Sequence, residues 1–242
     1  MKPRRARSLW PVLGLLVSVS FFFQRRTGRG LTGVVDMHFA GSKYGGWWFN
    51  KMALGERPVI YSFGLGEDTS WDEAMLQLGA EVYGFDPTPK AAAYVKTRQQ
   101  LNRSVRGKFV FTEEGLACES GVVTFSLPKN PSHVSLRRGE ISDSGGLVEL
   151  KVDTLSSFLA RNGHTHIDIL KIDIEGSEYD VLEDMLQRKF YPFTQLLVEF
   201  HRQFHGFDEQ RHTNLLSQLT HAGFVINKID ATNEVSFQRF QR

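Results

Sequence analysis

Cysteine is almost absent from this chain of 242 residues, which contains only Cys118. A single cysteine excludes an intrachain disulfide framework and a zinc site built from cysteines. Cys118 precedes the predicted turn Glu119-Ser120-Gly121 and has no predicted base beside it, so we expect a buried apolar side chain rather than a nucleophile. The composition, 41% hydrophobic and 23% charged, is that of one ordinary globular domain with a short appendage.

Acidic residues are missing from the first 30 positions, which hold seven basic residues. The rest of the chain therefore has 22 basic and 27 acidic residues, a formal charge of −5 that the whole-chain value of +2 conceals. An acidic body is a poor electrostatic match for phosphates, and we therefore expect no nucleic-acid partner.

Long hydrophobic runs are also scarce, and the one present is Leu9–Phe23, between two basic clusters. Fifteen helical residues span about 22 Å, less than a hydrocarbon core of ~30 Å, which suits a signal peptide. The following Phe-Phe-Phe-Gln-Arg-Arg lacks the small residues of a cleavage site. We predict an uncleaved signal anchor and linker in residues 1–30, a single-pass membrane attachment, and a lumenal domain over residues 31–242 in the endoplasmic reticulum or Golgi. Secretion or organelle targeting after cleavage is the alternative.

Beyond residue 33, short apolar segments alternate with helical patterns, which predicts an α/β domain with a mostly parallel sheet. A terminal antiparallel pair is expected over Phe224–Ile229 and Val235–Phe240, and an added hairpin over residues 115–127. The predicted parallel strands are Val59–Phe63, Glu81–Phe85, Lys108–Thr112, Ile167–Ile174 and Gln195–His201.

A ligand-binding turn is predicted where the first of these strands ends in Gly64-Leu65-Gly66, because glycine lets a ligand approach backbone amides closely. Asp86 lies 22 residues after Gly64, at the end of the next strand, where a carboxylate can accept hydrogen bonds from two ribose hydroxyls. An ordinary tight turn is the alternative.

The third glycine of a dinucleotide fingerprint is absent, since Thr69 occupies its position. Glu67 would repel a pyrophosphate but can pair with an ammonium group. The charges therefore favour S-adenosylmethionine, which has an amino group, a sulfonium and no phosphate, over NAD or FAD.

Polar side chains interrupt two otherwise apolar strands at their carboxyl ends, where ligands bind in open α/β sheets. Alternation places Lys171, Asp173 and Glu175 on one face of their strand, and Glu199 and His201 on one face of the next. Buried charges are costly unless they are paired, so such interruptions are often functional. Structural pairing, such as Lys171 with Asp173 or Glu199 with Arg202, is the alternative.

These residues are our predicted catalytic group: Asp173, Glu175, Glu199 and His201. One carboxylate or His201 would take the proton of a substrate hydroxyl during in-line methyl transfer. Asp173, Glu175 and His201 could also bind a divalent cation, but their spacing is not diagnostic, and no metal site is assigned. Two further segments, Gly41–Trp48 and the long loop Pro128–Gly146, are expected to shape the acceptor pocket, the first as a lid or as a packed flap.

Together these segments resemble the FkbM-type methyltransferases, a branch of the class I S-adenosylmethionine-dependent fold. The resemblance covers roughly residues 38–240, and its most specific part is Leu170-Lys171-Ile172-Asp173-Ile174-Glu175-Gly176. The other matching segments are Gly41–Trp48, Tyr61–Asp68, Val82–Pro89, Glu114–Ala117 and Leu196–His201.

The resemblance implies a Rossmann-like, mostly parallel seven-stranded sheet with an antiparallel terminal strand and helices on both faces. It implies cofactor contacts from Gly64, Gly66, Asp86 and Asp173, and Ser62, Leu65 and Glu67 of the same turn complete the predicted cofactor site. The family is similar to enzymes that methylate hydroxyl oxygens, so we expect an O-methyltransferase acting on a sugar or small-molecule acceptor. A degenerate methyltransferase-like binding protein and, further removed, an NAD-dependent oxidoreductase are the alternatives.

Overall fold

The computed structural model of the chain describes residues 35–98, 101, 106–126, 137–138, 146–202 and 207–240. The chain divides into the units Met1–Val34 and Val35–Arg242, and all described residues belong to the second. The predicted signal anchor and most of the loop 128–146 lie outside the described residues, so both stay predictions. None of the described helices has the length and apolar character needed to cross a membrane.

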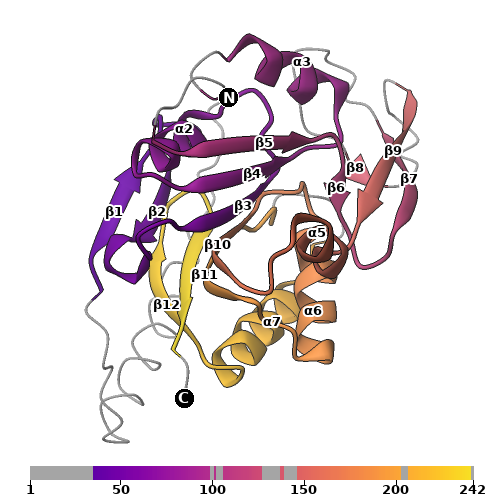
Figure 1. The fold of residues 1–242 in the computed structure, drawn as a ribbon. Coiled ribbons are helices and arrows are strands. Elements are labelled where there is room, and N and C mark those ends of the chain that lie inside the picture. Colours follow the sequence, from indigo (N-terminus) through magenta and orange to yellow (C-terminus); the bar gives the residue numbers. More distant parts are fainter. Residues whose placement is uncertain are drawn as a thin grey trace, which may run out of the picture. The chain divides into compact units, whose positions relative to one another are not determined.

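A seven-stranded sheet forms the centre of the second unit, in the order β12-β13-β11-β10-β3-β4-β5 (Figure 1). Neighbouring strands are parallel except around β13, which is antiparallel to both β11 and β12. The predicted mostly parallel sheet with a reversed terminal strand is confirmed. The strands are β3 (Val59–Phe63), β4 (Glu81–Phe85), β5 (Lys108–Thr112), β10 (Ile167–Ile172), β11 (Phe193–Glu199), β12 (Phe224–Ile229) and β13 (Glu234–Arg239).

Both faces of this sheet are covered, which explains why β3 and β10 are nearly continuously apolar. Successive residues enter opposite cores: Ile60 packs on one side of the sheet and Tyr61 on the other. One face is covered by α2 (Ser70–Gln77), α3 (Pro89–Thr97) and the hairpin of β1 (Met37–Ala40) and β2 (Trp47–Asn50), which leads into a short 3-10 helix at Lys51–Ala53. The other face is covered by α5 (Leu155–Asn162), α6 (Glu178–Arg188) and α7 (Glu209–His221).

A second sheet has the order β6-β9-β7-β8 and lies beyond the carboxyl ends of β4 and β5 (Figure 1). Its strands are β6 (Gly115–Leu116), β7 (Gly121–Ser126), β8 (Arg137–Arg138) and β9 (Leu147–Asp153). The predicted hairpin over residues 115–127 is wrong, because β6 and β7 pair with opposite edges of β9 and not with each other. Cys118, between them, is half-buried against the core rather than fully buried.

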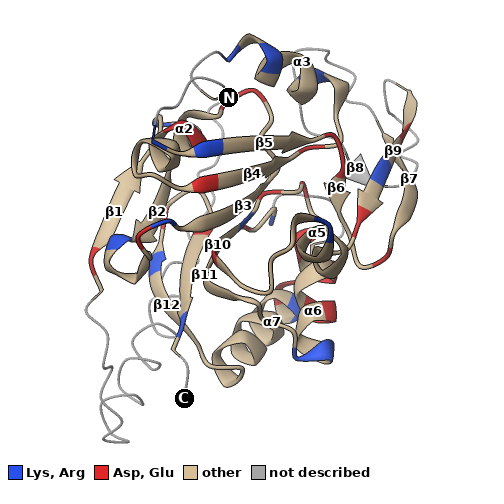
Figure 2. Ribbon diagram, in the orientation of Figure 1, with Lys and Arg blue, Asp and Glu red and all other residues tan. Residues whose placement is uncertain are grey.

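Ion pairs join α6 to α7 at the surface, where Arg211 of α7 lies near acidic residues of α6. Figure 2 marks the acidic positions of α6 in red. Arg211 donates to Asp180 at 2.6 Å and to Glu183 at 2.8 and 2.9 Å. Each exposed pair contributes at most about 1 kcal/mol. His212, the next residue of α7, is 2% exposed and packs against the rings of Tyr179 and Phe200.

We expect His212 to make the fold less stable in mild acid. Burial lowers the pKa of His212 to about 4, whereas an unfolded histidine has its ordinary value near 6.5. The unfolded chain therefore binds the extra proton first, and stability is lost as the pH falls from 6.5 toward 4. Between pH 7.5 and 5 the loss is about 2 kcal/mol. Urea unfolding of the wild type and of His212→Phe at both pH values measures it, and equal losses in the two proteins would contradict the prediction.

Candidate active site

A cavity of about 430 Å³ opens where the central strands end, within the size range of small-molecule sites. Its lining includes Gly64 after β3, Asp86 after β4, Asp173 after β10 and Glu199 at the end of β11. The second sheet supplies an apolar wall on the opposite side, formed by Leu116, Phe125, Leu150 and Val152. The cavity therefore joins a polar floor at the strand ends to an apolar wall.

The glycine turn is held at a point where three strands meet. The Gly64 amide donates to the Phe85 carbonyl at 2.9 Å, and the Asp173 amide donates to the Phe63 carbonyl at 3.1 Å. Gly64 has a φ of +79°, and a side chain there would overlap the Asp173 carbonyl group. Gly66 also has a positive φ, but there is open space where its side chain would lie. The first glycine is thus required by packing, and the second leaves the turn open toward the cavity.

Asp86 is buried and organises the loops on both sides of it. One carboxylate oxygen accepts from the Gly66 amide at 2.9 Å, and the other accepts from the amide and the hydroxyl of Thr88 at 2.9 and 2.6 Å. A carboxylate has about four lone-pair sites, so these donors leave room for roughly one further hydrogen bond. The prediction that Asp86 accepts hydrogen bonds from ribose hydroxyls stays a prediction.

The other predicted cofactor residues divide between the cavity and the core. Leu65 and Glu67 line the cavity, and Glu67 also pairs with Lys90 at 2.9 Å. Ser62 is fully buried and does not line the cavity. Strand alternation sends Ser62 to the face covered by α2, where it lies beside Asp72.

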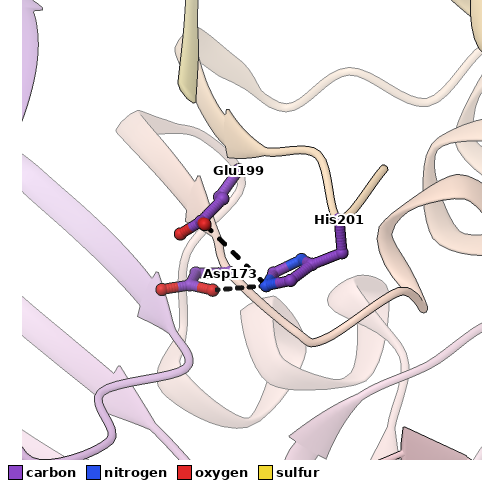
Figure 3. A group of neighbouring side chains, drawn as sticks. All are labelled: Asp173, Glu199 and His201. Carbon is purple, nitrogen blue, oxygen red and sulfur yellow. Dashed lines mark ion pairs between the residues drawn. The ribbon is translucent and has the colours of Figure 1, made fainter. Parts of the chain in front are cut away.

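His201 lies at the centre of a group of carboxylates at the other end of the floor (Figure 3). Its Nε2 atom is 3.3 Å from Glu175, 3.7 Å from Asp173 and 4.0 Å from Glu199. Its Nδ1 atom is 3.1 Å from Glu178. The structure therefore brings together all four predicted catalytic residues, although Asp173 and Glu175 lie in the turn after β10 rather than on the strand.

Glu178 was not among the predicted site residues. It is the first residue of α6, a position where an acidic residue needs no special explanation because it favours the helix amino terminus. Its side chain is completely buried and accepts hydrogen bonds from the amides of Gly176 and His201 at 2.8 and 2.7 Å. The sequence did contain one signal for Glu178 as a site residue, because this glutamate follows soon after the predicted site residues Asp173 and Glu175.

The pKa values in this group are strongly shifted. Burial alone would lower the pKa of His201, but the hydrogen bond to Glu178 and the surrounding carboxylates raise it to about 9. Burial and the charge of Asp173 raise the pKa of Glu199 to about 7. Burial also raises the pKa of Asp173, against the attraction of Lys171 and His201. The raised pKa of His201 favours its imidazolium form at neutral pH, which donates hydrogen bonds rather than accepting a proton.

Glu234 is a second glutamate that the sequence did not indicate. It begins β13, lines the cavity and lies directly opposite Glu199 in the antiparallel pairing of β11 and β13. Like charges in such positions destabilise a sheet. Burial and the neighbouring Glu199 raise the pKa of Glu234 to about 7. The floor of the cavity is therefore strongly acidic.

Lys171 lies beneath the glycine turn and is 5% exposed. Its Nζ atom donates to the Gly64 carbonyl at 2.7 Å and is 3.9 Å from Asp173. The predicted pairing of Lys171 with Asp173 is therefore present at long range, whereas Arg202 pairs with Glu209 and not with Glu199.

The segment 41–48 is a packed flap. Trp47 is buried in the core beside α2, and the Trp48 indole donates to Asp230 at 2.8 Å. Tyr44, in the turn between the two strands, lines the cavity and is 82% exposed. The two tryptophans thus fix the flap, and Tyr44 lies at the rim.

Comparison with protein families gives a match to the methyltransferase FkbM domain over residues 62–226. Among curated proteins, human probable methyltransferase-like protein 24 is 27% identical over 151 residues, which are 62% of this chain and 34% of that protein. The rat protein of the same name is 26% identical over the same length. The chain thus matches about a third of the length of these relatives.

Two of the solved structures that resemble this chain have low sequence identity to it. The methyltransferase FkbM of Methylobacillus flagellatus has a TM-score of 0.46 and 13% identity, covering 76% of this chain and 44% of that one. The magnesium protoporphyrin IX methyltransferase of Synechocystis PCC 6803, solved with bound S-adenosylmethionine, has a TM-score of 0.43 and 11% identity, covering 99% of this chain and 87% of that one.

Proposed function

The chain belongs to the FkbM methyltransferase family and has its Rossmann-like class I fold, and from this premise we propose that it transfers a methyl group from S-adenosylmethionine to a hydroxyl oxygen of a sugar or small-molecule acceptor. One observation carries the proposal. The glycine turn with Asp86 and the cluster of Asp173, Glu199 and His201 line the same cavity.

The cofactor end of the site is the turn from Gly64 to Glu67 together with Asp86. The remaining acceptor capacity of Asp86 suits a ribose hydroxyl. The carboxylates of Asp68, Asp173 and Glu67 around the turn suit the amino group and sulfonium of S-adenosylmethionine. The same charges disfavour the pyrophosphate of NAD.

The acceptor end is the carboxylate group around His201. In the proposed step the hydroxyl oxygen attacks the methyl carbon, the carbon–sulfur bond breaks, and the electron pair stays on sulfur to give S-adenosylhomocysteine. The hydroxyl proton passes to one of the cluster carboxylates, Asp173, Glu175 or Glu199. His201, with its raised pKa, holds these carboxylates together. The main contribution of the protein is to align donor and acceptor.

The acidic floor also bears on the class of acceptor. Asp173, Glu175, Glu199 and Glu234 line the cavity, against the two lysines Lys43 and Lys171. A phosphate-rich acceptor would be repelled from this floor. We therefore propose a neutral or cationic acceptor and no nucleic acid.

Calorimetry of the 242-residue chain with S-adenosylmethionine, S-adenosylhomocysteine and NAD tests the proposal. We expect the first two to bind and NAD not to bind. Binding of NAD alone would refute the proposal in favour of an oxidoreductase. Methyl transfer from labelled cofactor to a panel of sugars and small hydroxyl compounds then separates an enzyme from a protein that only binds the cofactor.

Asp86→Asn provides a sharper test of the cofactor end. The substitution replaces one acceptor oxygen by a donor, and we expect a loss of about 1–3 kcal/mol in S-adenosylmethionine binding, or about fivefold to 150-fold. Asp168→Asn is the matched control, because Asp168 also accepts two backbone amides but lies at the opposite end of the sheet. Equal affinities of the two variants would contradict the role given to Asp86.

A further inference from the structure

The imidazole ring of His201 has its two nitrogen atoms in different surroundings. Nδ1 faces Glu178, which is completely buried. Nε2 faces the cavity carboxylates Asp173 and Glu199 (Figure 3). We propose that Asp173, Glu199 and His201 bind one divalent cation through Nε2 and one oxygen of each carboxylate. The binding of the cation is independent of the proposed function, whereas the role given to it below rests on that function.

The positions of the three ligand atoms fit an ion. They lie within 4.8 Å of one another, with Nε2 at 3.7 Å from Asp173 and 4.0 Å from Glu199. Ligand atoms bound at 2.1 Å in an octahedral shell are about 3.0 Å apart when adjacent and about 4.2 Å apart when opposite. Shifts of up to about 1 Å in the two partly exposed carboxylates would therefore bring the three atoms to adjacent coordination positions and leave the other positions open.

Glu178 fixes the orientation of the His201 ring through Nδ1, the nitrogen that does not face the cavity carboxylates, as second carboxylates do in protein metal sites. A histidine ligand usually donates its second ring N–H to a carboxylate, which fixes the ring and makes the ligand nitrogen more basic. Glu178 occupies this position at 3.1 Å, and it also accepts the backbone amide of His201 at 2.7 Å. This carboxylate lies outside the ligand set, so it is an observation independent of the acidic cluster.

The negative charge of the site also favours the binding of a cation. Asp173, Glu175 and Glu199 surround Nε2, and Glu234 lies opposite Glu199. Among the described residues that line the cavity, the lysines are Lys43 and Lys171, and the Nζ atom of Lys171 is bound to the Gly64 carbonyl. A divalent ion bound at Nε2 would neutralise part of the negative charge of these carboxylates.

The ligand types narrow the choice of ion. Mg²⁺ and Ca²⁺ prefer shells made only of oxygen, whereas an imidazole nitrogen suits first-row transition metals. One nitrogen and two carboxylate oxygens leave further positions for water or substrate. We therefore infer an ion of the Mn²⁺ or Fe²⁺ type with an open coordination face.

Such an ion would bind the acceptor hydroxyl oxygen and lower its pKa, as metal ions do for bound water. Glu175, the cluster carboxylate that is not among the three ligands, would accept the hydroxyl proton as the oxygen attacks the methyl carbon. The ion keeps its charge throughout, and the carbon–sulfur electron pair goes to sulfur.

Binding of Mn²⁺ to the metal-depleted 242-residue chain, measured by the loss of the free-ion electron paramagnetic resonance signal, tests the proposal without cofactor or acceptor. We expect one Mn²⁺ per chain. We expect Glu199→Gln and Asp173→Asn each to weaken binding at least tenfold, because each removes one charged ligand. Glu183→Gln is the matched control, since Glu183 is a surface glutamate paired with Arg211, and it should bind as the wild type does.

The outcomes separate this proposal from the proposed function. Absence of stoichiometric Mn²⁺ binding in the wild type, or unchanged binding in both ligand variants, overturns the metal site even if S-adenosylmethionine binds. Mn²⁺ binding that depends on Glu199 and Asp173, in a chain that does not bind S-adenosylmethionine, supports the metal site and overturns the methyltransferase proposal. Circular dichroism of each variant confirms that its fold is retained.

Discussion

Replacing Gly64 by alanine is expected to destabilise the protein by about 2–6 kcal/mol. Two effects add at this position. The residue has a φ of +79°, and holding a residue other than glycine in this region costs on the order of 1–3 kcal/mol. The new methyl group would also overlap the Asp173 carbonyl, and forcing apart well-packed groups costs a further 1–3 kcal/mol or so.

Gly66→Ala is the matched control, because it has the same type of backbone conformation without the steric overlap. Its φ is +54° and there is open space where the side chain would lie, so we expect a loss of only about 1–2 kcal/mol. Urea unfolding of both variants without cofactor compares the free energies of unfolding. If the two losses were equal, the close approach of β3 to the turn after β10 would not be what requires glycine at position 64.

The strands around this turn could be predicted from the sequence because they are buried on both faces. Val59–Phe63 and Glu81–Phe85 have the predicted bounds in the structure, since a short apolar run ended by glycine or by Asp-Pro has few alternatives. The convergence of Asp173, Glu199 and His201 was also predictable, because the carboxyl ends of parallel strands meet at one edge of a sheet.

Other parts of the site depend on contacts between segments far apart in the chain. The strands β6 and β7 both pair with β9, which lies some 30 residues later in the chain. The local sequence 115–127 favours a hairpin because it carries no information about this distant partner. Glu234 faces Glu199 only because β13 is inserted between β11 and β12. Likewise, Glu178 is buried because His201 packs against it. The residue pattern of α6 alone does not show this burial.

Lys171→Met is expected to destabilise the protein by about 3–5 kcal/mol at pH 7, the usual cost of removing one partner of a buried charge pair. Lys171 is the main opposite charge acting on Asp72, which is 2% exposed. The variant also removes the donor to the Gly64 carbonyl, 2.7 Å from Nζ. The loss should therefore exceed that expected for an exposed ion pair.

A double-mutant cycle identifies the cause of this loss. In the Lys171→Met background, Asp72→Asn removes the uncompensated carboxylate and should recover about 2 kcal/mol, which appears as a coupling energy between the two residues. The matched cycle at Lys90 and Glu67, a partly exposed pair at 2.9 Å, should give less than about 1 kcal/mol. Equal coupling in the two cycles would show that Lys171 does not act by compensating Asp72.

The pH dependence of Lys171→Met tests whether the loss comes from the buried carboxylates that Lys171 compensates, which are Asp72 and also Asp173, whose pKa is likewise raised by burial and lowered by Lys171. Burial raises the pKa of Asp72 to about 6 even in the presence of Lys171, so an ionised Asp72 opposes folding and a protonated one does not. A carboxyl group with a raised folded pKa stabilises the fold at low pH and loses that contribution as the pH rises through this value. Lowering the pH from 7 toward 5 should therefore reduce the gap in unfolding free energy between Lys171→Met and the wild type. A gap that stays constant over this range would instead assign the loss to the hydrogen bond with the Gly64 carbonyl.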